Sequence, residues 1–122
     1  MPTPRERAWR VLLALLAMVV AALALTPAPP QHVSLGWDKL NHLAAFAALA
    51  ACAVCGWRDA RAARHTMLLA LLAFGGTIEL LQHHVPGRSG EWADLLADGI
   101  GIAIGALLAR CWLRRAAPQS PP

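Results

Sequence analysis

The sequence predicts an all-α integral membrane protein, a bundle of four helices with both termini in the cytoplasm. Of its 122 residues, 57% are hydrophobic and only 15% are charged, and the mean hydropathy is +0.47. Soluble domains carry about 25% charged residues. Four apolar stretches are each about long enough to cross a bilayer core, which takes about 20 helical residues. A soluble protein is therefore excluded.

The four spans are expected at about 8–26, 37–57, 66–82 and 92–113. The first has no charge after Arg10, the second is rich in Ala and Leu, and the fourth begins with acids and ends with arginines. Each must be helical because lipid offers no partners for backbone groups. We expect residues 1–115 to form one transmembrane domain and residues 116–122 a disordered tail.

Turn residues mark the connections between these spans. Three prolines in segment 26–34 end the first helix because proline lacks an N–H donor. Arginines fill segment 58–65, and a Pro-Gly turn lies in segment 85–90, where Ser89 is expected to N-cap the fourth helix. The Arg-rich start, apolar run and Ala22-Leu-Ala24 also fit a cleaved secretory signal, although the run is longer than usual for one.

The placement of the basic residues predicts the orientation. Nine of the eleven belong to three clusters, and only Lys39 and Arg88 belong to the other two connections. The clusters are Arg5, Arg7 and Arg10; Arg58, Arg61 and Arg64; and Arg110, Arg114 and Arg115. Short cytoplasmic loops are rich in Lys and Arg, so the clusters are expected inside. The basicity then reflects topology, and we expect no nucleic-acid partner.

Polar residues share helix faces toward the outer ends of three spans. Asp94 and Asp98 lie on the same face as Gly101 and Gly105, and small residues at that spacing allow close helix packing. Glu79 and Gln82 share a stripe of the third span, and Asp38 and His42 are one turn apart on the second. Ionisable residues inside spans normally face the bundle interior and mark function. The first span adds no such side chain, so we interpret it as a packing helix or anchor.

The candidate ligand-binding residues are Asp38, Lys39, His42, Glu79, Gln82, Arg88, Asp94 and Asp98. In a purely structural alternative, Lys39 and Arg88 neutralise Asp38 and one other acid, so that the cluster only fastens the helices together. No metal site and no cofactor are expected.

Histidines and cysteines give weaker signals. Glu79 and His83 are four residues apart, as a metal pair would be, but they lack the H-E-x-x-H pattern, and His83 and His84 are expected in solvent. Cys52 and Cys55 have the C-x-x-C spacing without the βαβ context of a redox site.

Three polar segments together resemble the VanZ-like family over about residues 37–109. They read D-K-L-N-H from 38 to 42, E-L-L-Q from 79 to 82, and P-G-R-S-G-E-W-A-D-L-L-A-D-G-I-G from 86 to 101. Asp98 stands where the family's last element has an amide. The resemblance implies a small multi-pass protein of the bacterial plasma membrane. One member of the family is linked to teicoplanin resistance, which implies a possible role in glycopeptide resistance but no settled activity.

Several functions stay open at this point. The leading hypothesis is an outer-leaflet pocket that binds or processes a polar or anionic cell-envelope ligand, such as a lipid-linked molecule. An enzyme would use His42 with Asp38 or Asp94 as an oriented base, without a recognisable nucleophile motif. The excess of acids also fits a proton or small-cation transporter, and the glycine faces fit a structural assembly partner. The oligomeric state is open.

Overall fold

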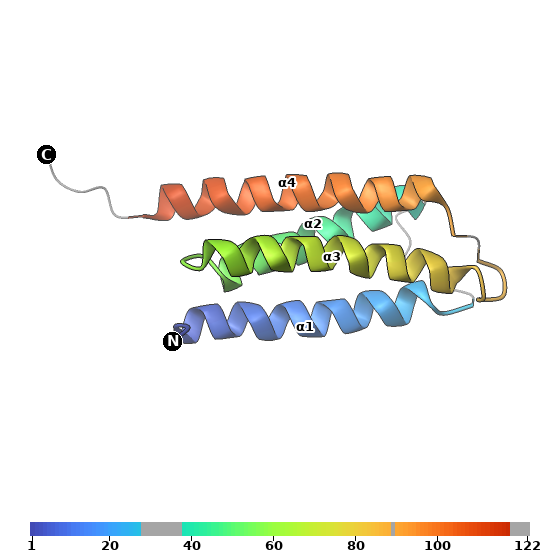
Figure 1. Ribbon diagram of the computed structural model, residues 1–122, viewed down its shortest axis with the longest axis horizontal. Helices are drawn as coiled ribbons and strands as arrows, with labels where there is room; N and C mark the ends of the chain where they lie inside the picture. Colours follow the sequence, from blue (N-terminus) through green and yellow to red (C-terminus); the bar gives the residue numbers. More distant parts are fainter. Residues whose placement is uncertain (28–37, 89, 118–122) are drawn as a thin grey trace, which may run out of the picture.

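Four long helices form the chain in the computed structural model, which describes residues 1–27, 38–88 and 90–117 (Figure 1). They are α1 (Pro4–Ala24), α2 (Asp38–Gly56), α3 (Arg61–Gln82) and α4 (Trp92–Ala116). All four are long and apolar enough to cross a membrane, and the described residues contain no strand. The predicted all-α membrane bundle is thus confirmed.

Local sequence explains where α1 begins. The Thr3 hydroxyl accepts a hydrogen bond from the Glu6 N–H at 3.1 Å, and the Glu6 carboxylate accepts one from the Thr3 N–H at 2.8 Å. This capping box starts α1 four residues before the predicted Ala8. The prediction of Ser89 as the cap of α4 was wrong, because α4 begins at Trp92 with Glu91 at its N-cap. Ser89 itself lies outside the described residues.

The α2 helix is the centre of the bundle, with its closest packing against α4. A Cβ atom added at Gly101 would meet the backbone of Leu43, and one at Gly105 would meet the backbone of Ala47. The glycine face that the sequence predicted as a packing surface therefore lies directly on α2. The fully buried apolar side chains are Phe46, Leu49, Ala50, Ala53 and Val54 of α2 and Ile78 of α3.

The α1 helix lies on the outside of the bundle and buries little of its surface. Val11, Leu15 and Met18 are half or more exposed, as a lipid-facing surface requires. Near its start, the Arg10 Nε donates to the Gly56 carbonyl at 2.7 Å, and the guanidinium lies 4.4 Å from the Trp57 ring centroid. This contact fastens α1 to the end of α2.

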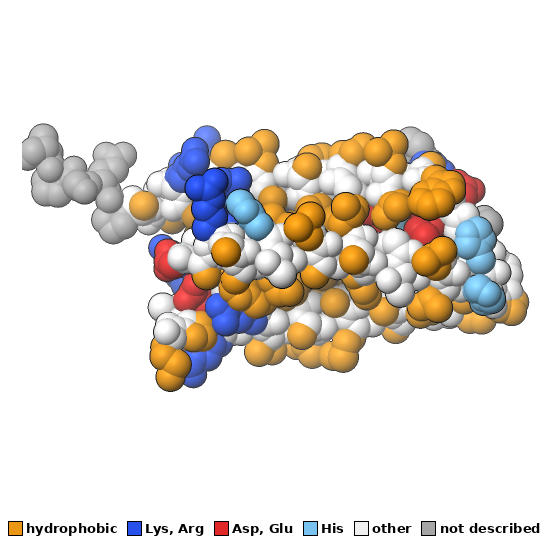
Figure 2. Space-filling view, viewed as in Figure 1, with side chains coloured by type: hydrophobic (Ala, Val, Ile, Leu, Met, Phe, Trp, Pro, Cys, Tyr) orange, Lys and Arg blue, Asp and Glu red, His pale blue; other side chains and the backbone are white. Residues whose placement is uncertain are grey.

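Charge separates the two ends of the bundle. The start of α1, the α2–α3 turn and the end of α4 lie at one end, where arginine side chains gather and which we call the basic end (Figures 1 and 2). The start of α2, the end of α3 and the start of α4 lie at the other end, which we call the polar end. The three arginine clusters therefore share one end of the fold, as the predicted topology requires.

Candidate functional site

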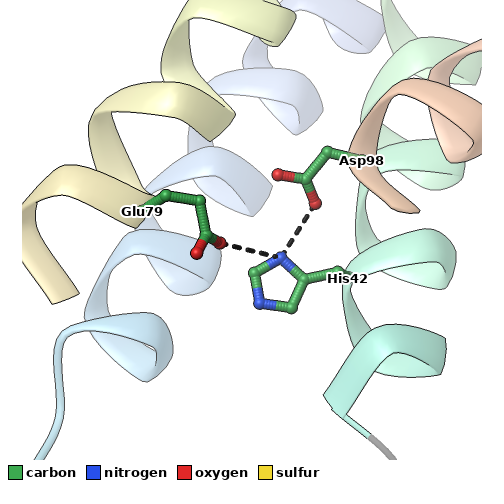
Figure 3. Close-up of side chains that lie close together, drawn as sticks. All are labelled: His42, Glu79 and Asp98. Atoms are coloured by element: carbon green, nitrogen blue, oxygen red, sulfur yellow. Dashed lines mark hydrogen bonds and ion pairs between the residues drawn. The ribbon is translucent and has the colours of Figure 1, made fainter. Parts of the chain in front are cut away.

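Three side chains from three helices converge near the polar end: His42 of α2, Glu79 of α3 and Asp98 of α4 (Figure 3). The His42 Nδ1 atom lies 2.8 Å from Asp98 Oδ1, at hydrogen-bond distance, and 3.6 Å from Glu79 Oε1. We call these residues the carboxylate–histidine triad. The second ring nitrogen of His42 points away from both carboxylates (Figure 3).

The triad is almost entirely out of contact with solvent. The side chains of His42, Glu79 and Asp98 are 13%, 9% and 0% exposed. Glu79 Oε1 and Asp98 Oδ2 are buried and have no hydrogen-bond partner among the described residues. Two carboxylates with unsatisfied oxygens are unfavourable in a low-dielectric interior unless a proton or a cation joins them.

Glycines bring the three helices close enough for the triad to form. A Cβ at Gly75 would lie 2.5 Å from Asp98 Oδ2, so a side chain on α3 would occupy the position of that carboxylate. Gly101 lets α4 approach the backbone of Leu43, the residue after His42. Gly75, together with Gly101, which the sequence identified as a packing position, therefore leaves the space for Asp98.

A polar pocket of about 90 Å³ adjoins the triad. Its lining residues are Lys39, His42, Gln82, Gly87, Arg88, Glu91 and Asp94. The Lys39 Nζ lies 3.0 Å from Glu91 Oε2 and 3.8 Å from Asp94 Oδ1. The Glu91 N–H donates to Glu79 Oε2 at 3.0 Å, which links the pocket wall to the triad.

Two side chains that line the pocket, Arg88 and Gln82, bind the end of α1. Arg88 donates from Nε to the Thr26 carbonyl at 3.2 Å and from Nη2 to the Leu23 carbonyl at 2.9 Å. Gln82, which is only 2% exposed, donates to the Ala24 carbonyl at 3.0 Å. These bonds satisfy carbonyl groups that a helix end leaves without partners. The end of α1 thus holds two of the pocket-lining side chains in place, in addition to the packing or anchoring role that the sequence predicted for this helix.

The structure brings most of the predicted site residues together. His42, Glu79 and Asp98 form the triad, and Lys39, Gln82, Arg88 and Asp94 line the pocket. The side chain of Asp38 lies outside the described part of the chain. His83 and His84 are exposed, as expected.

Sequence reasoning did not include two residues of the pocket, Gly87 and Glu91, among the candidates. Glu91 lies three residues before Asp94, and its acidic type was the only signal available. In the structural alternative Arg88 pairs with an acid, whereas the structure shows it donating to backbone carbonyls.

Comparison with known proteins agrees with the resemblance seen in the motifs. No curated protein and no solved structure is significantly similar to the chain. The profile described as VanZ/LLP1 matches residues 6–114, which includes all three helices of the triad and most of α1. That match covers nearly the whole chain, and the chain therefore belongs to the VanZ/LLP1 family of membrane proteins.

Proposed function

We propose that the pocket binds the polar headgroup of a membrane lipid or of a lipid-linked cell-envelope molecule. The polar end would lie in the outer leaflet of the bacterial plasma membrane, with both termini in the cytoplasm. The carrying observation is a pocket lined by charged groups at the end of an otherwise apolar helical bundle. Such a position lies at the depth of lipid headgroups once the apolar surfaces are in the membrane.

The lining favours a headgroup with charges of both signs. Lys39 and Arg88 line the pocket together with Glu91 and Asp94, so the formal charges of these four residues sum to zero. The pocket volume is about 90 Å³, and one water molecule in the liquid takes about 30 Å³. A single phosphate or ammonium group therefore fits the pocket. We infer that one charged group of the headgroup enters the pocket while the acyl chains stay in the bilayer.

A transport path receives no support from the same region. Toward the basic end, the interior beside α2 consists of apolar side chains, among them Phe46, Leu49 and Ala53. A proton or cation relay requires protonatable or coordinating groups across the whole membrane. The packing of α2 therefore favours binding at the polar end over conduction. The link to glycopeptide resistance that the family resemblance implies would follow if the bound molecule is a cell-wall precursor.

Mass spectrometry of the protein purified from bacterial membranes tests this proposal. We expect the wild type to retain phospholipid or a lipid-linked precursor through gentle delipidation. Lys39→Gln should lower its occupancy about tenfold, because a charge-assisted hydrogen bond contributes about 1.5–3 kcal/mol. Arg61→Gln is the matched control, since Arg61 is exposed at the basic end, and it should retain the lipid. Equal occupancy in the two variants would contradict the proposal.

A further inference from the structure

We propose that the carboxylate–histidine triad of His42, Glu79 and Asp98 binds a divalent transition-metal cation such as Zn²⁺ or Mn²⁺. The proposal concerns a site beside the headgroup pocket and does not depend on which lipid, if any, the pocket holds. The sequence had predicted no metal site, and its only weak metal signal was the spacing of Glu79 and His83.

The spacing of the donor atoms fits a shared ion. Two ligand atoms that bind one metal at about 2.0–2.2 Å, with angles of about 90–109° between the bonds, lie about 2.8–3.6 Å apart. The His42 Nδ1 atom is 2.8 Å from Asp98 Oδ1 and 3.6 Å from Glu79 Oε1, and all three donor positions fall within 4.8 Å of one another. The third distance, between the donor oxygens of Glu79 and Asp98, is within 4.8 Å, and rotation of the Glu79 side chain can shorten it to this range.

One oxygen of Glu79, which lies 3.6 Å from His42 Nδ1 and makes no hydrogen bond to a described residue, is an independent sign of a ligand. The Glu79 side chain is nine-tenths buried, and its Oε2 already accepts the Glu91 N–H. Its Oε1 points at His42 and has no hydrogen-bond partner among the described residues (Figure 3). A buried carboxylate oxygen without a partner is rare in folded proteins and marks an absent proton, water or ion.

Charge balance favours a dication over other occupants. A neutral imidazole and two ionised carboxylates carry a charge of −2, which one divalent cation cancels. Within a membrane that neutralisation matters, because an uncompensated charge is strongly unfavourable there. An imidazole nitrogen suits Zn²⁺ or Fe²⁺ and the two carboxylates also suit Mn²⁺, whereas Mg²⁺ and Ca²⁺ prefer oxygen ligands alone. Three protein ligands leave a fourth position for water.

Titration of the purified, metal-stripped protein with Zn²⁺ alone tests the proposal. We expect one ion per chain, with protons released because Nδ1 of His42 must be deprotonated to bind it. Asp98→Asn and Glu79→Gln should each weaken binding at least about 100-fold, the upper limit of the effect of losing an outer-shell partner. His84→Gln removes an exposed histidine outside the triad and should leave the affinity unchanged.

Binding of Co²⁺ provides a second measurement, which distinguishes a metal site from a cluster that only holds the helices together. The visible absorption of bound Co²⁺ should appear in the wild type and in His84→Gln and be lost in Asp98→Asn. Helical content and thermal unfolding without metal show whether each variant is folded, and Glu79→Gln replaces Asp98→Asn if the latter is not.

Absence of Zn²⁺ binding by the wild type, or equal binding by folded triad variants, would overturn the metal site and leave a cluster that holds only protons. Because no lipid is added, this outcome is independent of the headgroup experiment.

Discussion

The close contact between α4 and α2 depends on Gly105, and the substitution Gly105→Ala tests this dependence. A methyl group at this position would overlap the backbone carbonyl of Ala47. Backbone atoms of a helix cannot rotate away as a flexible side chain can, so the two helices must separate. Overpacking of this kind typically costs about 1–3 kcal/mol.

Gly99→Ala provides a matched control on the same helix. The nearest atom to a Cβ at Gly99 is Leu72 Cδ1 at 3.8 Å, an ordinary van der Waals contact. Both substitutions gain the same preference of alanine over glycine for helix, about 1 kcal/mol. The difference in unfolding free energy between the two variants therefore isolates the overlap at Gly105, and we expect about 1–3 kcal/mol, with Gly99→Ala the more stable.

Equilibrium unfolding in mixed micelles of mild detergent and SDS, followed by circular dichroism, measures this difference. Gly105→Ala should unfold at a lower SDS fraction than the wild type or Gly99→Ala. Identical transitions for the two variants would refute the argument, because they would mean that α4 does not lie against the α2 backbone at this position.

Three further predictions concern the ends of the bundle. Arg10→Ala should destabilise the protein by about 1–3 kcal/mol through loss of a hydrogen bond and a cation–π contact, whereas Arg7→Ala, at an exposed position, should change stability by less than about 0.5 kcal/mol in the same assay. Arg88→Lys should speed amide hydrogen exchange in the α3–α4 connection, because one ammonium cannot replace both guanidinium donors to α1; unchanged exchange would contradict this anchoring role. In intact cells and on a cysteine-free background, a membrane-impermeant thiol reagent should label His84→Cys and not Ala62→Cys; the reverse pattern would invert the predicted orientation.

The helices could be predicted from the sequence because each one depends on the residues of its own segment. Apolar length alone requires a helix in lipid, and the spacing of Gly101 and Gly105 identified the face of α4 that packs on α2. The same reasoning placed Asp98 on that face and pointed it inward. Start positions were less accurate, because polar and charged residues such as those of the Thr3–Glu6 capping box extend a helix beyond its apolar part.

The triad was harder to predict because it depends on how three helices are rotated and shifted relative to one another. His42, Glu79 and Asp98 are separated by 37 and 19 residues, so no spacing rule connects them. Sequence reasoning therefore weighed only a weak metal signal between Glu79 and His83, which are four residues apart, and predicted no metal site. The role of Arg88 was also inaccessible, because its acceptors are backbone carbonyls, which every residue possesses.

The bonds at the end of α1 bear on the order in which the protein is assembled. The donors for its last carbonyl groups are supplied by Gln82 and Arg88, which follow their acceptors by 58 to 65 residues. During synthesis α2, the main packing partner of α1, is made before these donors, so the bonds at the end of α1 form later than the packing of α1 on α2. A nascent chain halted before Gln82 could hold α1 against α2 through Arg10 and Gly56, but it would lack the side-chain donors to the carbonyl groups at the end of α1.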